Sequence, residues 1–204
     1  MRSLYYFLTK DLYLRLYRRF CQILTLIYFS LNGIKHGKVV CIGMPLLDIH
    51  PKGSCSIGTN VSMVSKSWFA TLGKNNRCKL MVYPHAALRI GNKVGMSNTT
   101  VVATMSVVIG DNVMIGAGVT IVDSDFHSLN PIHWHTHDDA MKMKRLPVNI
   151  GNDVFIGMNS TILKGVTVGS NAVIAAESLI TQNIPANEVW GGNPAKFIRN
   201  NKII

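Results

Sequence analysis

Acidic residues are scarce in this 204-residue chain, which has eight Asp and two Glu against 21 Lys and Arg, a formal net charge of +11. Charged residues of either sign make up only 15% of the sequence, whereas hydrophobic residues make up 48%. A disordered chain needs the opposite balance, so this composition excludes disorder. The length predicts one large domain or two small ones, and the basic balance leaves a nucleic-acid-binding module open.

Cysteine is also sparse. The four cysteines, Cys21, Cys41, Cys55 and Cys78, contain no C-x-x-C pair and no dense framework. Small secreted scaffolds stapled by disulfides need such a framework. We therefore expect reduced, cytosolic thiols that pack as small hydrophobic side chains.

The first 31 residues contain no Gly or Pro and predict an amphipathic helix within residues 1–35. Its uncharged stretch, residues 20–33, is too short to cross a bilayer, and basic residues spread from Arg2 to Arg19 disfavour a cleavable signal peptide. Two interpretations stay open. The helix packs on its own domain or on a partner subunit, or it lies peripherally on the cytoplasmic face of a membrane.

A period of six residues organises the chain from about residue 39 onward. Aliphatic residues occupy every sixth position in four runs: Ile150, Ile156, Ile162, Val168, Ile174 and Ile180; Ile109, Ile115 and Ile121; Ile90, Met96 and Val102; Ile57 and Met63. One flat strand and one tight corner take six residues, so about eighteen residues close a triangular coil. Glycine followed by Asn or Asp suits the corners. We therefore predict an all-β parallel β-helix over residues 36–183, with an aliphatic column along its axis.

Two segments interrupt this period. Residues 65–87 predict a longer, partly extended excursion, and residues 123–147 predict a polar, His-rich loop extruded from the column. A repeat domain that interrupts its own core in this way usually does so for function. Residues 184–204 contain no hexapeptide repeat and predict a short basic tail.

Residues 57 to 199 resemble the hexapeptide-repeat acyltransferases. The most specific pieces are the sequence GNPAK from Gly192 to Lys196, the Ile184-Pro185 pair before it, and an Asp-Phe-His loop followed by Pro131. The block from Pro147 to Arg199 is similar to sugar O-acetyltransferases of the maltose/galactoside and capsule/lipopolysaccharide type. The resemblance implies a left-handed β-helix, a homotrimer with sites between subunits, acetyl-CoA as co-substrate, and no metal. It also implies a saccharide acceptor, such as a capsule, lipopolysaccharide or other cell-surface glycan precursor.

The resemblance further assigns catalytic residues. His127 is the expected general base, because imidazole can take a hydroxyl proton near neutral pH. Asp125 is expected to orient His127, with Asp123, Asp138 and Asp139 as alternatives. The amide of Met158 is the expected oxyanion donor. Asn98 and Asp139 are expected to contact the acceptor, although Asn98 also suits a corner position.

For coenzyme A, the resemblance places Ala176 and Thr181 along the pantetheine arm and Lys196 and Arg199 at the phosphates. Lys164 is a further candidate that equally suits a solvated corner. The chain departs from the family pattern Gly-Ala-Gly-Ser, because it reads Ala-Ala-Glu-Ser at residues 175–178. Because both glycines are replaced, one of them by an acid, we expect the coenzyme A contacts at residues 175–178 to differ from the family pattern.

Three other functions stay open. His133, His135 and His137, with His127 and His85, are candidate zinc ligands of the γ-carbonic anhydrase kind, although alternate histidines in one irregular loop are typical of a polar lid. A catalytically silent β-helix that serves assembly is the second. A nucleic-acid-binding module is the third, but no stacking or groove-reading motif accompanies the charge. We expect a cytoplasmic O-acetyltransferase.

Overall fold

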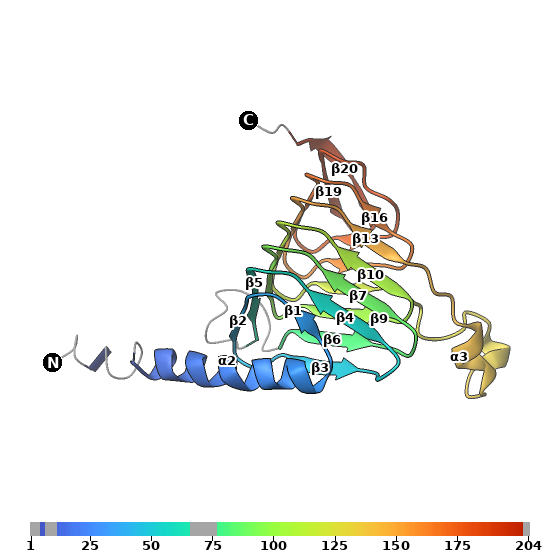
Figure 1. The fold of residues 1–204 in the computed structure, drawn as a ribbon. Helices are drawn as coiled ribbons and strands as arrows, with labels where there is room; N and C mark the ends of the chain where they lie inside the picture. The colour runs from blue at the N-terminus through green and yellow to red at the C-terminus, as the bar shows by residue number, and fades with distance from the viewer. Residues whose placement is uncertain (1–4, 7–11, 66–76, 202–204) are drawn as a thin grey trace.

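The computed structural model describes residues 5–6, 12–65 and 77–201. A helix, α2 (Tyr13–Leu31), leads into short strands that wind into a triangular column (Figure 1). Sheet A contains β1 (Lys35–His36), β4 (Ser54–Ile57), β7 (Ala87–Ile90), β10 (Ser106–Ile109), β13 (Val148–Ile150) and β16 (Thr167–Val168). Sheet B contains β2 (Val39–Ile42), β5 (Val61–Val64), β8 (Gly95–Ser97), β11 (Met114–Ile115), β14 (Phe155–Ile156), β17 (Val173–Ile174), β19 (Glu188–Gly192) and β20 (Ala195–Asn200). Sheet C contains β3 (Leu46–Ile49), β6 (Lys79–Val82), β9 (Thr100–Ala103), β12 (Thr120–Val122), β15 (Thr161–Ile162) and β18 (Leu179–Ile180).

The chain visits the three sheets in the order A, B, C, so each coil has an A–B, a B–C and a C–A edge. Neighbouring strands within each sheet pair in parallel, except β19 with β20, which pair antiparallel. The repeat therefore forms a parallel β-helix, as predicted. None of the helices in the described residues is long and apolar enough to cross a membrane.

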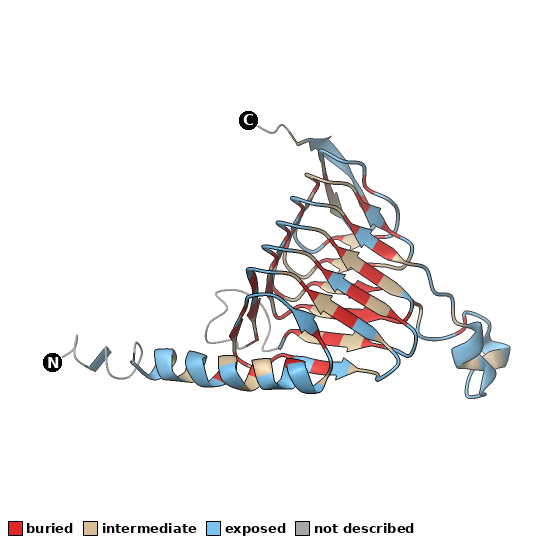
Figure 2. Ribbon diagram, in the orientation of Figure 1, coloured by how far each residue is buried: buried red, intermediate tan, exposed pale blue. Residues whose placement is uncertain are grey.

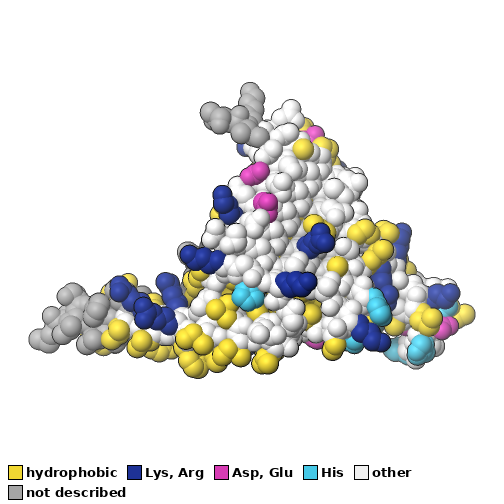
Figure 3. Space-filling model, in the orientation of Figure 1, with side chains coloured by type: hydrophobic (Ala, Val, Ile, Leu, Met, Phe, Trp, Pro, Cys, Tyr) yellow, Lys and Arg dark blue, Asp and Glu magenta, His cyan; other side chains and the backbone are white. Residues whose placement is uncertain are grey.

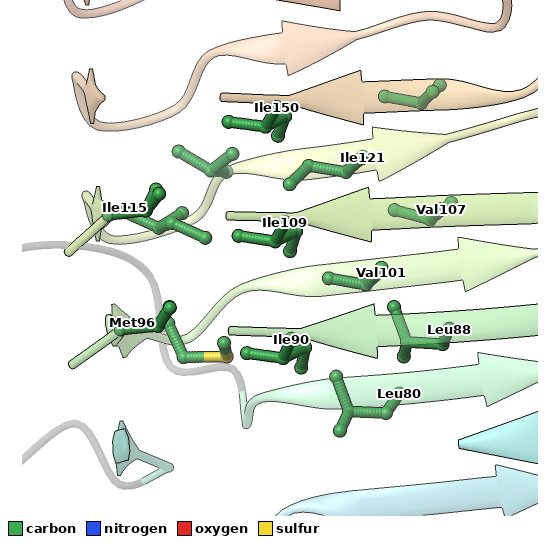
Figure 4. Packing of buried hydrophobic residues seen from close by; sticks show 14 of the residues in the cluster. Leu80, Leu88, Ile90, Met96, Val101, Val107, Ile109, Ile115, Ile121 and Ile150 are labelled. Carbon is green, nitrogen blue, oxygen red and sulfur yellow. The ribbon is translucent and has the colours of Figure 1, made fainter. Parts of the chain in front are cut away.

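The hexapeptide positions build the core, as Figures 2 and 4 show. All six repeat residues from Ile150 to Ile180 are at most 2% exposed. The small residues that follow them by four positions, such as Val154, Ser160 and Ala172, are equally buried. The inward-facing aliphatic side chains thus form a continuous column, in which truncation to Ala costs about 2–5 kcal/mol per residue.

Glycines on the A–B edge allow the coils to stack closely. A Cβ on Gly58 would lie 2.5 Å from the carbonyl oxygen of Gly91, and one on Gly91 would lie 2.5 Å from that of Gly110. Polar side chains close the same corners: Asn92 accepts a hydrogen bond from the amide of Thr59 (2.9 Å), and Asp111 accepts one from the amide of Asn92 (2.6 Å). The Ile-Gly-Asn pattern therefore reflects coil packing as much as turn formation.

Helix α2 covers the first coil. Its buried face carries Cys21, Thr25 and Phe29. The Gln22 amide pairs with strand β2, because Nε2 donates to Val39 O and Oε1 accepts from Cys41 N, both at 2.7 Å. Gln22 thus satisfies backbone groups that an end strand would otherwise leave unpaired.

The structure corrects three predictions, two of them element boundaries. The excursion predicted over residues 65–87 is wrong for its second half, because β6 pairs with β3 and β9 inside the column; residues 66–76 lie outside the described residues. The predicted tail also joins the column, where Ile184 is buried and β19 extends sheet B beside β17.

The third correction concerns Val102, which was predicted at a repeat position. Strand β9 instead pairs Val101 with Ile121 and Val102 with Val122. The corner after Met96 is one residue shorter than the corner after Ile115, and Asn98 fills it with a left-handed backbone, φ 49°. The tight corner therefore shifts the register by one residue.

Candidate active site

The extruded loop, residues 123–147, leaves the column at the C–A edge between β12 and β13. Its base is held by an antiparallel bridge between Ser124 and Arg145, and by hydrogen bonds from Asp125 N to Lys144 O (3.1 Å) and from Leu146 N to Asp123 O (2.9 Å). The loop therefore projects from a paired neck, as the isolated lobe in Figure 1 shows.

Asp123 has a structural role in this neck. Its fully buried carboxylate accepts hydrogen bonds from the amides of Thr104, Met105 and Ser106, at 2.7, 2.7 and 2.8 Å, and from the Thr104 hydroxyl at 2.8 Å. These contacts use both carboxylate oxygens. Asp123 therefore fixes the turn between β9 and β10 and does not contact His127 in the structure.

His127 lies at the outer end of the neck, after Phe126, whose φ of 63° is unusual for a bulky residue. Its side chain is 74% exposed. Strained backbone of this kind, which costs of the order of 1–3 kcal/mol, persists where surrounding contacts determine it, and it is concentrated at functional sites.

Asp139 provides the contact that fixes His127. This carboxylate comes from the short helix α3 (Asp138–Lys142); its Oδ2 lies 2.6 Å from His127 Nδ1, and its Oδ1 accepts from the amide of Ser128 at 2.7 Å. The hydrogen bonds from His127 and Ser128 lower the pKa of Asp139 below its ordinary value. An ionised carboxylate only accepts, so Nδ1 carries the proton and Nε2 of a neutral ring is left with a free lone pair.

A cavity of about 350 Å³ opens beside this pair. Its lining is Asp125, His127, Ser128, Leu129, Trp134, His135 and Asp139. A short 3₁₀ helix, η2 (Pro131–His133), precedes Trp134. The Trp134 indole donates to Ser128 O at 2.7 Å, which joins this helix to the residue that follows His127. The loop thus brings an oriented imidazole and a largely apolar pocket together.

Asp125 does not orient His127, which corrects the sequence prediction. Its carboxylate forms an ion pair with Lys164, which follows β15 on the same C–A edge, and both side chains are 19% exposed. Because the Lys164 ammonium is engaged in this ion pair, Lys164 links the loop to the next coil. This corrects its predicted role as a cofactor contact. Asp125 precedes His127 by two residues but pairs with Lys164, whereas Asp139 reaches His127 from helix α3.

Three other predicted residues gather on the B–C edge. Asn98, Met158 and Ala176 occupy successive corners there, with Gly116 between the first two. The Met158 amide nitrogen lies close to Gly116, where a Cβ would approach it to 2.6 Å. Asn98 is only 1% exposed, which favours the corner role over contact with an acceptor.

The remaining predicted residues are exposed. Thr181 follows β18 at the C–A edge, and Lys196 and Arg199 lie on β20, at the C-terminal end of the column. Glu177, at the family departure, has a left-handed backbone and accepts a hydrogen bond from Asn159 Nδ2 at 2.6 Å. That bond explains how an acid replaces glycine at this corner.

In the described residues, no three His, Cys, Asp or Glu side chains come close enough to hold a metal ion. The four cysteines are buried and free, as predicted, and burial raises the pKa of Cys41 and Cys55 to about 12.

Sequence reasoning missed two residues of this site, Ser128 and Trp134. Ser128 acts through its backbone amide and carbonyl, and Trp134 acts through its indole nitrogen, which donates to that carbonyl. Neither residue type carries a specific signal for this role in the sequence. Only the three-dimensional path of the loop shows it.

Comparison with known protein families identifies the six-residue repeat in two segments of the chain. The profile described as "Bacterial transferase hexapeptide (six repeats)" matches residues 147–182, and "Hexapeptide repeat of succinyl-transferase" matches residues 97–122. Both segments lie in the column.

The chain is similar to galactoside O-acetyltransferase of Escherichia coli, with 38% identity over 66% of this chain and 65% of that protein. It is also similar to γ-carbonic anhydrase 2 of Arabidopsis thaliana, with 30% identity over 76% of this chain and 50% of that protein. The chain thus spans under two thirds of the length of either relative.

Among solved structures, a galactoside acetyltransferase in complex with coenzyme A is 29% identical, covers 71% of this chain and 66% of that one, and has a TM-score of 0.54. The column is therefore the left-handed parallel β-helix of these relatives, and two of its segments match the hexapeptide repeat of bacterial transferases.

Proposed function

We propose that this chain is an acetyl-CoA-dependent O-acetyltransferase that acts on a saccharide hydroxyl, with His127 as general base. The observation that carries the proposal is the exposed imidazole whose Nδ1 is fixed by Asp139. The similarity to galactoside O-acetyltransferase supports the acetyl donor and the sugar acceptor.

The proton chemistry follows from the tautomer. His127 Nε2 takes the proton of the acceptor hydroxyl as its oxygen forms a bond to the thioester carbon. The C–S bond then breaks, and the imidazolium returns the proton to the departing thiolate of coenzyme A. Asp139 stabilises the transient imidazolium, because its carboxylate is already hydrogen-bonded to Nδ1.

The oxyanion donor lies on a different edge of the column. Met158 occupies the B–C edge, whereas His127 projects from the C–A edge, and sheet C separates the two. One chain therefore does not bring them together. We infer a homotrimer in which the C–A edge of one subunit meets the B–C edge of its neighbour, so that the Met158 amide faces the reacting carbonyl.

The same assembly suits coenzyme A as co-substrate. Ala176 lies on the B–C edge and Thr181 on the C–A edge, so they can line one pantetheine arm where two subunits meet. Lys196 and Arg199 are exposed cations on β20 that suit the phosphates. Lys164 does not fit, because Asp125 occupies it.

We further propose a cell-surface glycan precursor, of the capsule or lipopolysaccharide kind, as acceptor and the cytoplasm as location. The four free, buried thiols support a reducing compartment. The excess of basic residues suits an anionic carrier group on the acceptor.

A mass-spectrometric screen tests the function. The full chain is incubated with acetyl-CoA and a panel of nucleotide sugars and lipid-linked glycans, and O-acetylated products are sought. The proposal predicts a product and stoichiometric release of the coenzyme A thiol. Zinc bound in stoichiometric amounts with CO₂ hydration, and no acetyl transfer to any glycan, would instead support the carbonic anhydrase alternative.

A further inference from the structure

Helix α2 has a second apolar face that no described residue covers. Opposite its buried face lie Leu16 (59% exposed), Phe20 (61%), Ile23 (60%), Ile27 (52%) and Leu31 (79%). Their spacings of four, three, four and four residues place them in one stripe. Figure 3 shows this row of hydrophobic side chains along the underside of the helix, turned away from the column.

Basic side chains flank the stripe. Helical geometry places Arg15 and Arg19 on one margin of the apolar face. Arg18, Arg19 and Lys38 also line a groove of about 600 Å³ between α2 and β2, whose other walls include Ile23 and Val40. Asp11 is the only acid in residues 1–47, so the cations of this region have few acidic neighbours in sequence.

The orientation of the helix leaves only this face for a partner. Gln22 and Phe29 hold the opposite face against the first coil, and the helix lies across the N-terminal end of the column in Figure 1. If the proposed trimer forms about an axis parallel to the column, it presents three such stripes at one end of the assembly. That geometry suits a flat partner.

We propose that the outer face of α2 binds the surface of a bilayer that contains anionic lipids. The apolar stripe enters the boundary between headgroups and acyl chains, and the flanking arginines contact lipid phosphates. The cations distinguish this partner from a second copy of the chain, because two such faces would bring like charges together. The bilayer claim does not depend on the acetyl-transfer chemistry.

Vesicle co-sedimentation of the full chain tests the proposal. Vesicles of phosphatidylcholine alone are compared with vesicles that also contain phosphatidylglycerol. We expect binding to the anionic vesicles, weakened by added salt, and much weaker binding to the zwitterionic ones.

Two paired variants separate the contributions of apolar area and charge. Leu16→Gln/Ile23→Gln should lower the partition coefficient at least about a hundredfold, because two buried aliphatic side chains are lost. Arg15→Gln/Arg19→Gln should lower it about thirtyfold. All four positions are exposed, so thermal unfolding should be nearly unchanged.

Matched controls lie elsewhere on the column. Met105→Gln/Met114→Gln removes exposed apolar side chains, and Arg89→Gln/Lys93→Gln removes exposed cations; both should leave vesicle binding unchanged. No vesicle binding by the full chain, or equal loss in the controls, would overturn the proposal. The proposal would also be overturned if the full chain does not bind vesicles and Leu16→Gln/Ile23→Gln lowers the oligomer mass. That result would identify the apolar face as a contact between copies of the chain.

Acetyl transfer to a water-soluble acceptor is measured on the same samples. The helix variants should keep the rate of the unaltered chain. Loss of vesicle binding with retained acetyl transfer would therefore concern only the membrane contact of helix α2. Absence of acetyl transfer in every sample, by contrast, would contradict the proposed function.

Discussion

At the residue scale, the site depends on which acid reaches His127. Asp125 is nearest in sequence, but Lys164 holds it against the column. Asp139 lies twelve residues away and is aligned by the Ser128 amide. The contact gives His127 the tautomer that a general base requires.

Replacing Asp139 tests this assignment. Asp139→Asn should lower kcat/KM about 10²–10⁴-fold, because the amide can donate to Nδ1 and favour the wrong tautomer. Steady-state kinetics with acetyl-CoA measures the change. Asp138→Asn, at the exposed neighbouring position, is the matched control and should retain activity; equal losses in the two variants would contradict the role of Asp139.

The pH dependence follows from the lowered pKa of Asp139. A depressed carboxyl pKa means that the contribution of the ionised Asp139 is present above the ordinary Asp range, near pH 4, and is lost as pH falls through the lowered value. Asp139 thus stays ionised throughout the neutral range. The pH profile of kcat/KM should therefore show no limb caused by Asp139 at or above the ordinary Asp range, and an acid limb there that disappears from the residual activity of Asp139→Asn would be inconsistent with this assignment.

Lys164 is a positioning residue at this scale. Lys164→Met should destabilise the fold by about 1–3 kcal/mol, because it leaves the part-buried Asp125 carboxylate without its counter-ion. Chemical denaturation measures the loss, and Asp125→Asn/Lys164→Met should recover part of it. The KM for acetyl-CoA should rise for Arg199→Gln but stay near its original value for Lys164→Met.

At the element scale, most strands and the extent of the extruded loop were predictable, whereas the contacts within the loop were not. Every residue at the sixth position from Ile150 to Ile180 is buried, since the repeat turns that side chain toward the axis in each strand. Strand β6 was missed because Leu80 and Val82 fill the core without an Ile-Gly signature. The loop contacts depend on backbone groups of residues such as Ser128, which leave no pattern in the sequence.

Helix α2 makes its own testable contribution. Gln22→Met should lower the free energy of unfolding by about 1–3 kcal/mol, because the Val39 carbonyl and the Cys41 amide lose their partners. Hydrogen exchange should show faster exchange at Cys41 than in the control Ser30→Ala, whose side chain is exposed. Unchanged protection would argue against the capping role.

At the scale of the whole molecule, the column holds the proposed general base and the proposed oxyanion donor of the acetyl-transfer reaction on different edges. The imidazole lies at the C–A edge and the candidate oxyanion donor at the B–C edge. Light scattering should therefore report three times the mass of the chain. Mixing a His127→Asn chain with an Arg199→Gln chain tests whether two subunits share one active site. If they do, mixed assemblies should be more active than the two variants measured separately. An activity equal to the sum of the two separate activities would contradict a shared site.

The most direct test of the account measures His127 itself. The rate of coenzyme A thiol release and the amount of O-acetylated glycan are compared for the full chain, His127→Asn and the control His85→Asn. We predict a loss of about 10²–10⁴-fold in His127→Asn, with unchanged thermal unfolding and full activity in His85→Asn. Acetyl transfer that continues at the original rate in His127→Asn would contradict the central claim.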